Sequence, residues 1–342
     1  FILRWQITQE KLENDLVFYK DNEGETYGML TVIPPKREGF FGLARDIVFV
    51  VDRSGSMEGL KMISAIKACS ILLDTLGPDD RFSILAFDDS MDWFTPFNKD
   101  TKTKFINADE AGIEKGNKFL REITARGGTE LDSAIGEAIQ AIKKRKNNTE
   151  NMPLILLLTD GQIGDESRVL KRIQKELNDS RVFTVGIDTA VNESFLKRLA
   201  VLGGGTSTFV VPGEELETAL QVIGREIGNP LLIDINIQDE NSNIIDNSTA
   251  PANIPDLFAG RTVNIFFKAK NPDSITVTGK FFQGGNFSSS VKGHEVNVSA
   301  ISQLWAKSKI FSLEDDYRVS EANSYGEKPV RDKNKIKEEI IN

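Results

Sequence analysis

The sequence predicts a doubly wound α/β domain, with a mostly parallel sheet flanked by helices, and an antiparallel β-sandwich built from the segments on either side of it. Between residues 44 and 228, short apolar runs alternate with segments whose apolar residues recur every three or four positions, which is typical of strands joined by crossover helices. Residues 229–300 instead alternate apolar and polar side chains, with Asn, Gly and Ser between the runs, which is typical of antiparallel sheets.

This pattern divides the chain into a β segment with a linker (1–43), the α/β domain (44–228), the sandwich (229–300) and a helical, charged tail (301–342). Because the first and third parts are both strand-like, we expect one sandwich built from both, with the α/β domain inserted between them. Such an insertion is sterically easy, since the two ends of a domain commonly lie close together at its surface.

Each element follows from its local pattern. In the first part we expect strands at 1–8 and 26–33, separated by a polar stretch, and a linker over the Pro- and Gly-containing residues 34–42. In the α/β domain the apolar runs predict strands at 46–51, 81–87, 153–159, 181–187 and 207–212, with a short extended piece at 91–97. Segments with helical periodicity predict helices at 60–76, 113–124, 131–146, 165–177, 192–203 and 214–227. Beyond them we expect strands at 229–239, 261–270, 274–284 and 293–300, a helix at 300–316, and a frayed, charged end at 327–342.

Composition excludes several classes of function. The net charge of −9 argues against a binder of the nucleic-acid backbone. Cys69 and His294 are the only cysteine and histidine, so an internal disulfide, a CxxC zinc site and a Cys–His nucleophilic pair are excluded. No apolar run approaches the ~20 residues that cross a bilayer. The chain starts at Phe1 without a targeting pattern, so we expect a fragment whose membrane association would need an anchor outside it.

One short motif carries chemistry. Asp52, Ser54 and Ser56 follow an apolar run at alternate positions, with Gly55 between the serines. In a doubly wound sheet, ligands bind at the carboxyl ends of the strands, where these three oxygen-bearing side chains would lie. The pattern alone occurs by chance in roughly one chain in ten of this length, and a capped Ser/Gly turn is its structural alternative.

Two distant segments favour a cation site over a turn. Thr129 follows two glycines and precedes a predicted helix, and Asp160 ends the next strongly apolar strand. Two carboxylates and three hydroxyls form an all-oxygen set suited to Mg²⁺ or Mn²⁺. Hydroxyl ligands would leave the metal electron-poor, and a position facing solvent would accept a carboxylate from another molecule.

These residues resemble the metal-ion-dependent adhesion site of von Willebrand factor type A domains, whose five motif positions are present in the family's order. The resemblance implies Ser54, Ser56 and Thr129 as direct ligands of Mg²⁺ (or Mn²⁺ or Ca²⁺), with Asp52 and Asp160 either acting through water or switching to direct coordination. Segments such as "LLLTDGQIGDE" and "LWAKSKIFSLED" are similar to proteins that combine a VIT domain with a type A domain, including inter-α-trypsin inhibitor heavy chains and, more closely, their bacterial relatives. Most of the VIT domain is absent, and the segment that esterifies animal heavy chains to hyaluronan is not visible, so that activity is not expected.

The resemblance implies a cation-dependent adhesion or protein-binding module whose partner presents a carboxylate, with ligand binding coupled to shifts of loops and of the helix at 214–227. It favours a secreted or cell-surface location and leaves a cytoplasmic one open; it sets no oligomeric state. An alternative is a scaffold subunit of an intracellular ATPase complex that uses the same metal site. A Mg²⁺-dependent hydrolase is disfavoured, because the sequence offers no phosphate loop, no second metal cluster and no His or Lys base near the motif.

The neighbours of the motif have two interpretations. Arg53, Met57, Glu130 and Asp188 are candidates for a ligand-binding rim, as are the acids at 88 and 89. Their alternative interpretation is surface filler and solvated loop acids.

Overall fold

The computed structural model describes residues 11–35, 44–94, 104–145, 151–212, 220, 224, 227, 230–239, 243–259, 261–270, 273–282, 284–322 and 332–341. The chain divides into two compact units, Gly42–Gly228 and a second that joins Phe1–Phe41 to Asn229–Asn342, and each is described by itself. The strand predicted at 1–8, most of the linker at 34–42 and most of the helix predicted at 214–227 lie outside the described residues.

The unit Gly42–Gly228 is built on a seven-stranded sheet in the order β5–β4–β3–β7–β8–β9, with β6 paired to β4. Its strands are β3 (Arg45–Asp52), β4 (Arg81–Phe87), β5 (Met91–Trp93), β6 (Ile106–Asn107), β7 (Met152–Thr159), β8 (Arg181–Ile187) and β9 (Ser207–Val210). The pairings β3–β4, β3–β7, β7–β8 and β8–β9 are parallel, whereas β5 and β6 pair with β4 antiparallel. The predicted doubly wound sheet is therefore confirmed.

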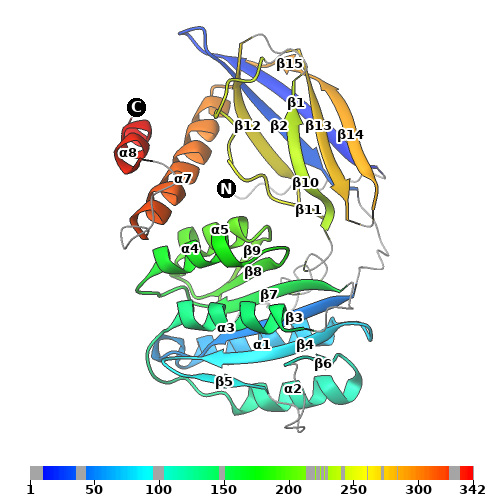
Figure 1. Cartoon of the computed structure of the whole chain (residues 1–342), viewed down its shortest axis with the longest axis vertical. Coiled ribbons are helices and arrows are strands. Elements are labelled where there is room, and N and C mark those ends of the chain that lie inside the picture. The colour runs from blue at the N-terminus through cyan, green and yellow to red at the C-terminus, as the bar shows by residue number, and fades with distance from the viewer. Residues whose placement is uncertain are drawn as a thin grey trace. The chain divides into compact units, whose positions relative to one another are not determined.

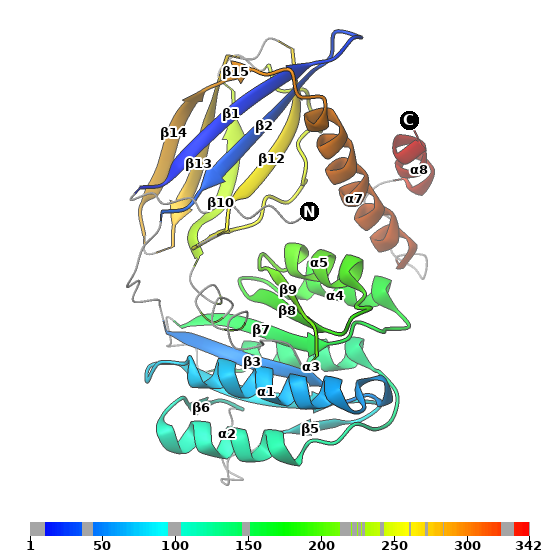
Figure 2. The ribbon, with the colours of Figure 1, turned by 180° about the vertical axis from the view of Figure 1, so that it is seen from behind.

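Helices cover both faces of this sheet. They are α1 (Leu60–Asp74), α2 (Glu110–Glu122), α3 (Leu131–Lys143), α4 (Glu166–Glu176) and α5 (Glu193–Leu202). α3, α4 and α5 lie in front of the sheet in Figure 1, and α1 lies in front of it from the opposite side in Figure 2. Because both faces are covered, every residue of β3 and β7 is buried, which explains the apolar runs Ile47–Val51 in β3 and Leu154–Leu158 in β7.

The strand order places the predicted motif at a reversal point of the sheet. From β3 the chain continues to β4 on one side, and β7 pairs with β3 on the other side. Asp52 is the last residue of β3, and Thr159 is the last residue of β7. The carboxyl ends of these neighbouring strands form the crevice at which doubly wound sheets bind their ligands.

The other unit is a β-sandwich of two four-stranded sheets, ordered β12–β2–β1–β15 and β11–β10–β13–β14. Its strands are β1 (Glu13–Lys20), β2 (Thr26–Ile33), β10 (Pro230–Gln238), β11 (Leu257–Phe258), β12 (Val263–Ala269), β13 (Ser274–Phe281), β14 (Asn286–Lys292) and β15 (His294–Glu295). β2 pairs with β12 over seven residue pairs, so the expected sandwich built from both flanking segments is confirmed. One pairing departs from the expected antiparallel pattern, because β1 and β15 run parallel.

A long helix packs against this sandwich. α7 (Ala300–Ala322) contacts β2 and β12, and the short α8 (Lys333–Ile341) packs on α7. The indole of Trp305 donates to the carbonyl of Ser248 at 2.6 Å, and its ring lies 5.5 Å from that of Tyr27. α7 extends beyond the predicted 300–316, and α8 forms within the stretch predicted to be frayed.

Two strands of the sandwich depart from the predicted pattern. β1 lies in the segment interpreted as a polar stretch, and β14 was predicted as a turn. Only Leu16–Phe18 interrupt the polar residues of β1, yet Leu16 and Phe18 join the sandwich core. Of the strand predicted at 293–300, only His294–Glu295 is a strand.

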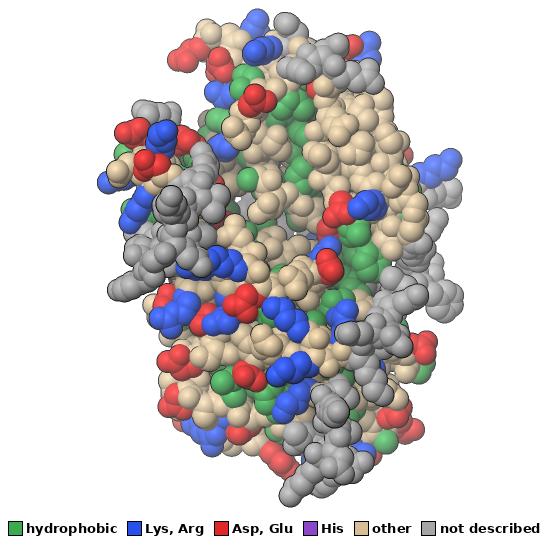
Figure 3. All heavy atoms as spheres, in the orientation of Figure 1, with side chains coloured by type: hydrophobic (Ala, Val, Ile, Leu, Met, Phe, Trp, Pro, Cys, Tyr) green, Lys and Arg blue, Asp and Glu red, His purple; other side chains and the backbone are tan. Residues whose placement is uncertain are grey.

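The face drawn in Figure 3 carries basic and acidic side chains close together. On α3, α4 and α5 they form ion pairs, including Arg172–Asp132 at 2.8 Å and Lys197–Glu193 at 2.6 Å. This face therefore lacks the continuous positive surface typical of nucleic-acid binding. In the part of the chain that the structure describes, no helix has the length and apolar character needed to span a bilayer.

Candidate metal site at the strand tips

The loop after β3 turns back on itself, and this turn brings two serine hydroxyls together. The backbone N–H of Ser54 donates to Asp52 Oδ1 at 2.9 Å, and the N–H of Met57 donates to the carbonyl of Ser54 at 2.9 Å. Residues Gly55–Met57 form a single 3₁₀ turn. As a result the Oγ atoms of Ser54 and Ser56 lie 3.0 Å apart. The two serines, which alternate with Gly55 in the sequence, therefore direct their hydroxyl groups to one place.

The tip of β7 supplies the second carboxylate. The hydroxyl of Thr159 donates to Asp52 Oδ2 at 2.6 Å, which ties the ends of β3 and β7 together. The next residue, Asp160, is fully buried and accepts the N–H of Gln162 on Oδ1 at 3.1 Å. Gly161 adopts a φ of 77°, a conformation that residues with a side chain rarely accept, so the chain can turn sharply after the acid.

The segment before α3 lies against the same loop. The N–H of Gly55 donates to the carbonyl of Gly127 at 3.1 Å, and the N–H of Arg126 donates to the carbonyl of Arg53 at 2.7 Å. These two bonds hold the segment beside the serine loop two residues before Thr129. The half-buried Thr129 follows at the start of α3, which begins at Leu131. Two strand-to-helix connections, after β3 and β7, and the connection between α2 and α3 therefore bring the five predicted ligand residues to one region.

Arg53 and Met57, predicted as candidates for a ligand-binding rim, are placed in the interior instead. Met57 is 0% exposed, and Arg53 is 5% exposed. Arg53 pairs with Asp92 at 2.5 Å and with Asp88 at 3.2 Å, and Arg126 pairs with the same two acids at 3.2 Å and 2.8 Å. Residue 53 follows the last residue of a buried strand, so its side chain turns inward and braces the loops rather than facing a ligand.

The other two rim candidates differ from each other. Glu130 is exposed, and its N–H donates to the carbonyl of Asp88 at 2.9 Å. Asp188, at the tip of β8, binds the ammonium of Lys61 at 2.9 Å, and Lys61 also binds Asp160 Oδ2 at 2.9 Å. A lysine therefore lies beside the motif, and its ion pairs with two carboxylates keep it from serving as the base that we did not expect there. Lys61 was missed because it stands in α1, where a lysine is usually solvated, although it is only nine positions beyond the start of the motif.

The ionisation of these groups follows from their partners. Burial raises the pKa of Asp52, and the hydrogen bonds from Thr159 and Ser54 offset only part of that shift. Burial raises the pKa of Asp88 as well, but hydrogen bonds from Ser90 and Arg126 outweigh it and leave that pKa well below its usual value. The hydrogen bond from Lys61 lowers the pKa of Asp188, against a smaller opposing effect of burial.

For Lys61 itself, burial lowers the pKa, but the hydrogen bonds to Asp188 and Asp160 outweigh that effect and raise it. Its ammonium is therefore charged over the whole neutral range, and it acts as a permanent positive charge beside Asp160.

The donor set fits a hard divalent cation. Asp52 is buried, and within the described residues it accepts only from neutral donors, so its negative charge lacks a cationic partner. A buried carboxylate without compensation is costly, and a cation beside the paired serine oxygens would supply that compensation. Among the described residues no three His, Cys, Asp or Glu side chains converge into a metal-holding group, so the candidate site depends on hydroxyl oxygens. Oxygen-only ligation suits Mg²⁺, Mn²⁺ or Ca²⁺.

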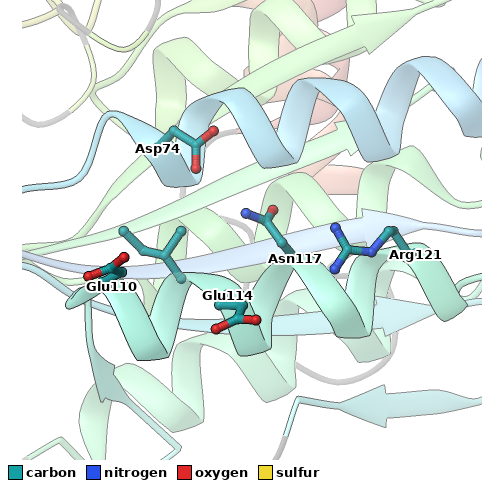
Figure 4. A pocket seen from close by; sticks show the side chains of 6 residues that line it. Asp74, Glu110, Glu114, Asn117 and Arg121 are labelled. Atoms are coloured by element: carbon teal, nitrogen blue, oxygen red, sulfur yellow. The ribbon is translucent and has the colours of Figure 1, made fainter.

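A separate hollow lies between α1 and α2. Its volume is about 510 Å³, and its lining comprises Asp74, Glu110, Ile113, Glu114, Asn117 and Arg121 (Figure 4). None of the predicted site residues lines it. Asp74 ends α1, whereas the candidate metal site lies where α1 begins, so the hollow is a distinct feature.

Comparison with known proteins identifies relatives in sequence and in fold. Residues 45–209 match the family model of the von Willebrand factor type A domain. The chain is 27% identical over 281 residues to inter-α-trypsin inhibitor heavy chain H2 of Mus musculus, which covers 78% of this chain and 28% of that protein. It is 29% identical over 253 residues to heavy chain H4 of Homo sapiens, covering 70% of this chain and 26% of that protein. The chain thus spans about a quarter of the length of these curated relatives.

Two solved structures share the fold. A von Willebrand factor type A protein from Catenulispora acidiphila aligns with a TM-score of 0.62 and 13% identity, covering 94% of this chain and 88% of that one. The ArnB paralog VWA2 from Sulfolobus acidocaldarius aligns with a TM-score of 0.52 and 17% identity, covering 97% and 88% of the two chains. At these identities the likeness concerns the fold alone.

Proposed function

Because this chain belongs to the von Willebrand factor type A domain proteins of the inter-α-trypsin inhibitor heavy-chain-like group, we propose that it binds a protein partner through a divalent cation held at the tips of β3 and β7. The partner contributes a carboxylate. Mg²⁺ is the expected cation, with Mn²⁺ or Ca²⁺ as substitutes.

The observation that carries this proposal is the pair of serine oxygens 3.0 Å apart beside the buried, uncompensated Asp52. Ser54, Ser56 and Thr129 would hold the cation directly. Asp52 and Asp160 would lie on the protein side of the cation. In each of them both carboxylate oxygens already accept a hydrogen bond. Bound there, a divalent cation supplies an open position for an anionic oxygen.

The chemistry of these residues favours binding over catalysis. A hydrolase needs a base that takes a proton from water, and the site must bring the pKa of that base close to the working pH. Lys61, which lies beside the site, is held in its charged form by Asp160 and Asp188 and therefore cannot accept a proton. The buried acids Asp52, Asp88 and Asp160 are fixed by hydrogen bonds or ion pairs with the protein.

The site is tested by titrating Mg²⁺ into the protein calorimetrically. Asp52→Ala and Thr129→Ala are expected to abolish measurable binding, with circular dichroism showing the fold retained. Matched controls are Asp74→Ala, an exposed acid at the far end of α1, and Thr278→Ala on β13, both of which should bind as the parent does. If both site variants bound Mg²⁺ as the parent does, the assignment of Asp52 and Thr129 to a metal site would be wrong.

The partner is tested by a pull-down performed with Mg²⁺ and again with EDTA. A partner retained only with Mg²⁺, and lost with Asp52→Ala, supports the proposal. On the family resemblance we propose that this binding takes place outside the cytoplasm. The alternative, a scaffold subunit in the cytoplasm, would instead recover an ATPase or assembly protein in the Mg²⁺-dependent fraction.

A further inference from the structure

Lys61 places a permanent positive charge within the candidate metal site. It is the second residue of α1, and its ammonium lies 2.9 Å from Asp160 Oδ2 and 2.9 Å from Asp188 Oδ2. The side chains are 20% exposed for Lys61, 17% for Asp188 and 0% for Asp160. Salt screens a sheltered ion pair only weakly, so the positive charge of Lys61 repels any cation that binds nearby.

The two carboxylates of the site have different surroundings. Asp52 accepts from two neutral donors, the N–H of Ser54 and the hydroxyl of Thr159. Asp160 accepts from one neutral donor, the N–H of Gln162, and from the ammonium of Lys61. The ammonium of Lys61 beside Asp160 weakens the attraction of this carboxylate for a second cation, because two positive charges near one acid repel each other.

The net charge of the cluster decides whether the loaded site attracts or repels a partner's carboxylate. Asp52, Asp160 and Asp188 carry three negative charges, and Lys61 offsets one of them. Asp89, which lies beside Gly127, and the exposed Glu130 add further negative charge around these four side chains. The neighbouring ion pairs of Arg53 and Arg126 with two aspartates add no net charge. Without Lys61 the loaded cluster would carry one more negative charge and would repel a partner's carboxylate more strongly.

We propose that Lys61 is a fixed cation of this site, which holds Asp160 back from the metal, weakens binding of the free divalent cation and lowers the negative charge that the loaded site presents to a carboxylate partner. This inference rests on the proposed function and concerns the regulation of the same site. It assigns to Lys61 a positioning role that acts through Asp160 and Asp188.

The inference is tested by titrating Mn²⁺ into Lys61→Gln, with Lys115→Gln as the matched control. Lys115 is an exposed residue of α2, so its variant loses the same charge away from the site. Lys61→Gln is expected to bind Mn²⁺ about tenfold more tightly, since a repelling charge has been removed from a sheltered position. Lys115→Gln should keep the parent affinity.

A second variant moves the affinity in the opposite direction. Asp188→Asn removes one negative charge and leaves Lys61 to Asp160 alone, so Mn²⁺ should bind more weakly than to the parent. It also keeps the test decisive if Lys61→Gln fails to fold, as judged by circular dichroism. Acetate serves as the carboxylate probe. When acetate displaces water from bound Mn²⁺, the water-proton relaxation rate falls. Lys61→Gln should need a higher acetate concentration than the parent for the same decrease in this rate.

The outcomes separate this inference from the proposed function. If the parent binds no Mn²⁺, the proposed function fails. If the parent binds Mn²⁺ but Lys61→Gln binds no more tightly than Lys115→Gln, or Asp188→Asn binds no more weakly than the parent, only the role of Lys61 is overturned.

Discussion

Asp52 and Asp88 are equally buried aspartates of one site region, yet their surroundings differ. Asp88 pairs with Arg53 and Arg126, and its pKa is lowered. Asp52 accepts only from neutral donors among the described residues, and burial raises its pKa. An acid that is paired stabilises the fold, whereas an uncompensated buried acid destabilises it. At the scale of residues, this contrast separates the acid that is held by ion pairs from the acid that we propose faces a cation.

This contrast predicts the effect of Asp52→Asn on stability. Because the pKa of Asp52 is raised in the folded state, the folded protein binds more protons than the unfolded chain between the ordinary and the raised pKa. Stability therefore falls as pH rises through that window and stays reduced at neutral pH. Asparagine cannot ionise, so in EDTA at neutral pH Asp52→Asn should unfold at a higher temperature than the parent. Added Mg²⁺ should raise the unfolding temperature of the parent only.

Asp88→Asn is the control, since it removes a paired acid of similar burial. It is expected to lose about 3 kcal/mol of unfolding free energy in urea titrations, because the nearly buried guanidinium of Arg53 loses a partner. If Asp52→Asn were destabilised in EDTA like Asp88→Asn, its carboxylate would have to be a structural group.

At the scale of elements, the connection between α5 and β9 depends on a close approach of backbones. The N–H of Val182 in β8 donates to the carbonyl of Gly203 at 3.0 Å, and the N–H of Gly205 donates to the carbonyl of Ala200 at 2.9 Å. A Cβ at Gly205 would overlap the backbone carbonyl oxygen of Val182. Since backbone atoms cannot rotate away as a side chain can, the tight loop requires glycine here.

Gly205→Ala should therefore lower the free energy of unfolding by about 2 to 3 kcal/mol, because β8 or the loop must shift. Gly164→Ala is the matched control, as its added Cβ would meet nothing within 4 Å. It should change stability by less than about 0.5 kcal/mol. Equal urea midpoints for the two variants would contradict the close approach.

At the scale of the whole molecule, one unit is continuous in sequence and the other is not. Gly42–Gly228 contains its whole sheet, whereas the sandwich takes β1 and β2 from one side of that segment and its remaining strands from the other. Leu16, Phe18, Leu30 and Val32, from β1 and β2, belong to the sandwich core. We therefore propose domain boundaries at the ends of the inserted unit.

Separate expression tests these boundaries. The fragment Gly42–Gly228 should unfold cooperatively and bind Mn²⁺ with the affinity of the whole chain. The fragment Asn229–Asn342 should lack a cooperative transition in circular dichroism, because β12 has lost β2 and the core has lost four large side chains. A cooperative transition in this second fragment alone would contradict the shared sandwich.

The sequence by itself determined the architecture of the α/β unit and the order of the candidate ligands. The predicted strands 81–87 and 181–187 coincide with β4 and β8, because a strand covered on both faces must be mostly apolar, and that requirement is local. The motif likewise placed Asp52, Ser54 and Ser56 at a strand tip without reference to distant residues.

Only the tertiary structure decided which neighbours take part. It buried Met57, turned Arg53 into an ion-pair network and brought Lys61 to Asp160 and Asp188, residues 99 and 127 positions away. It also made a strand of Glu13–Lys20, whose few apolar residues are buried by pairing with β2 and β15. In each case the deciding contact joins residues far apart in the chain. Local periodicity and propensity carry no information about such contacts, which is why the sequence left them open.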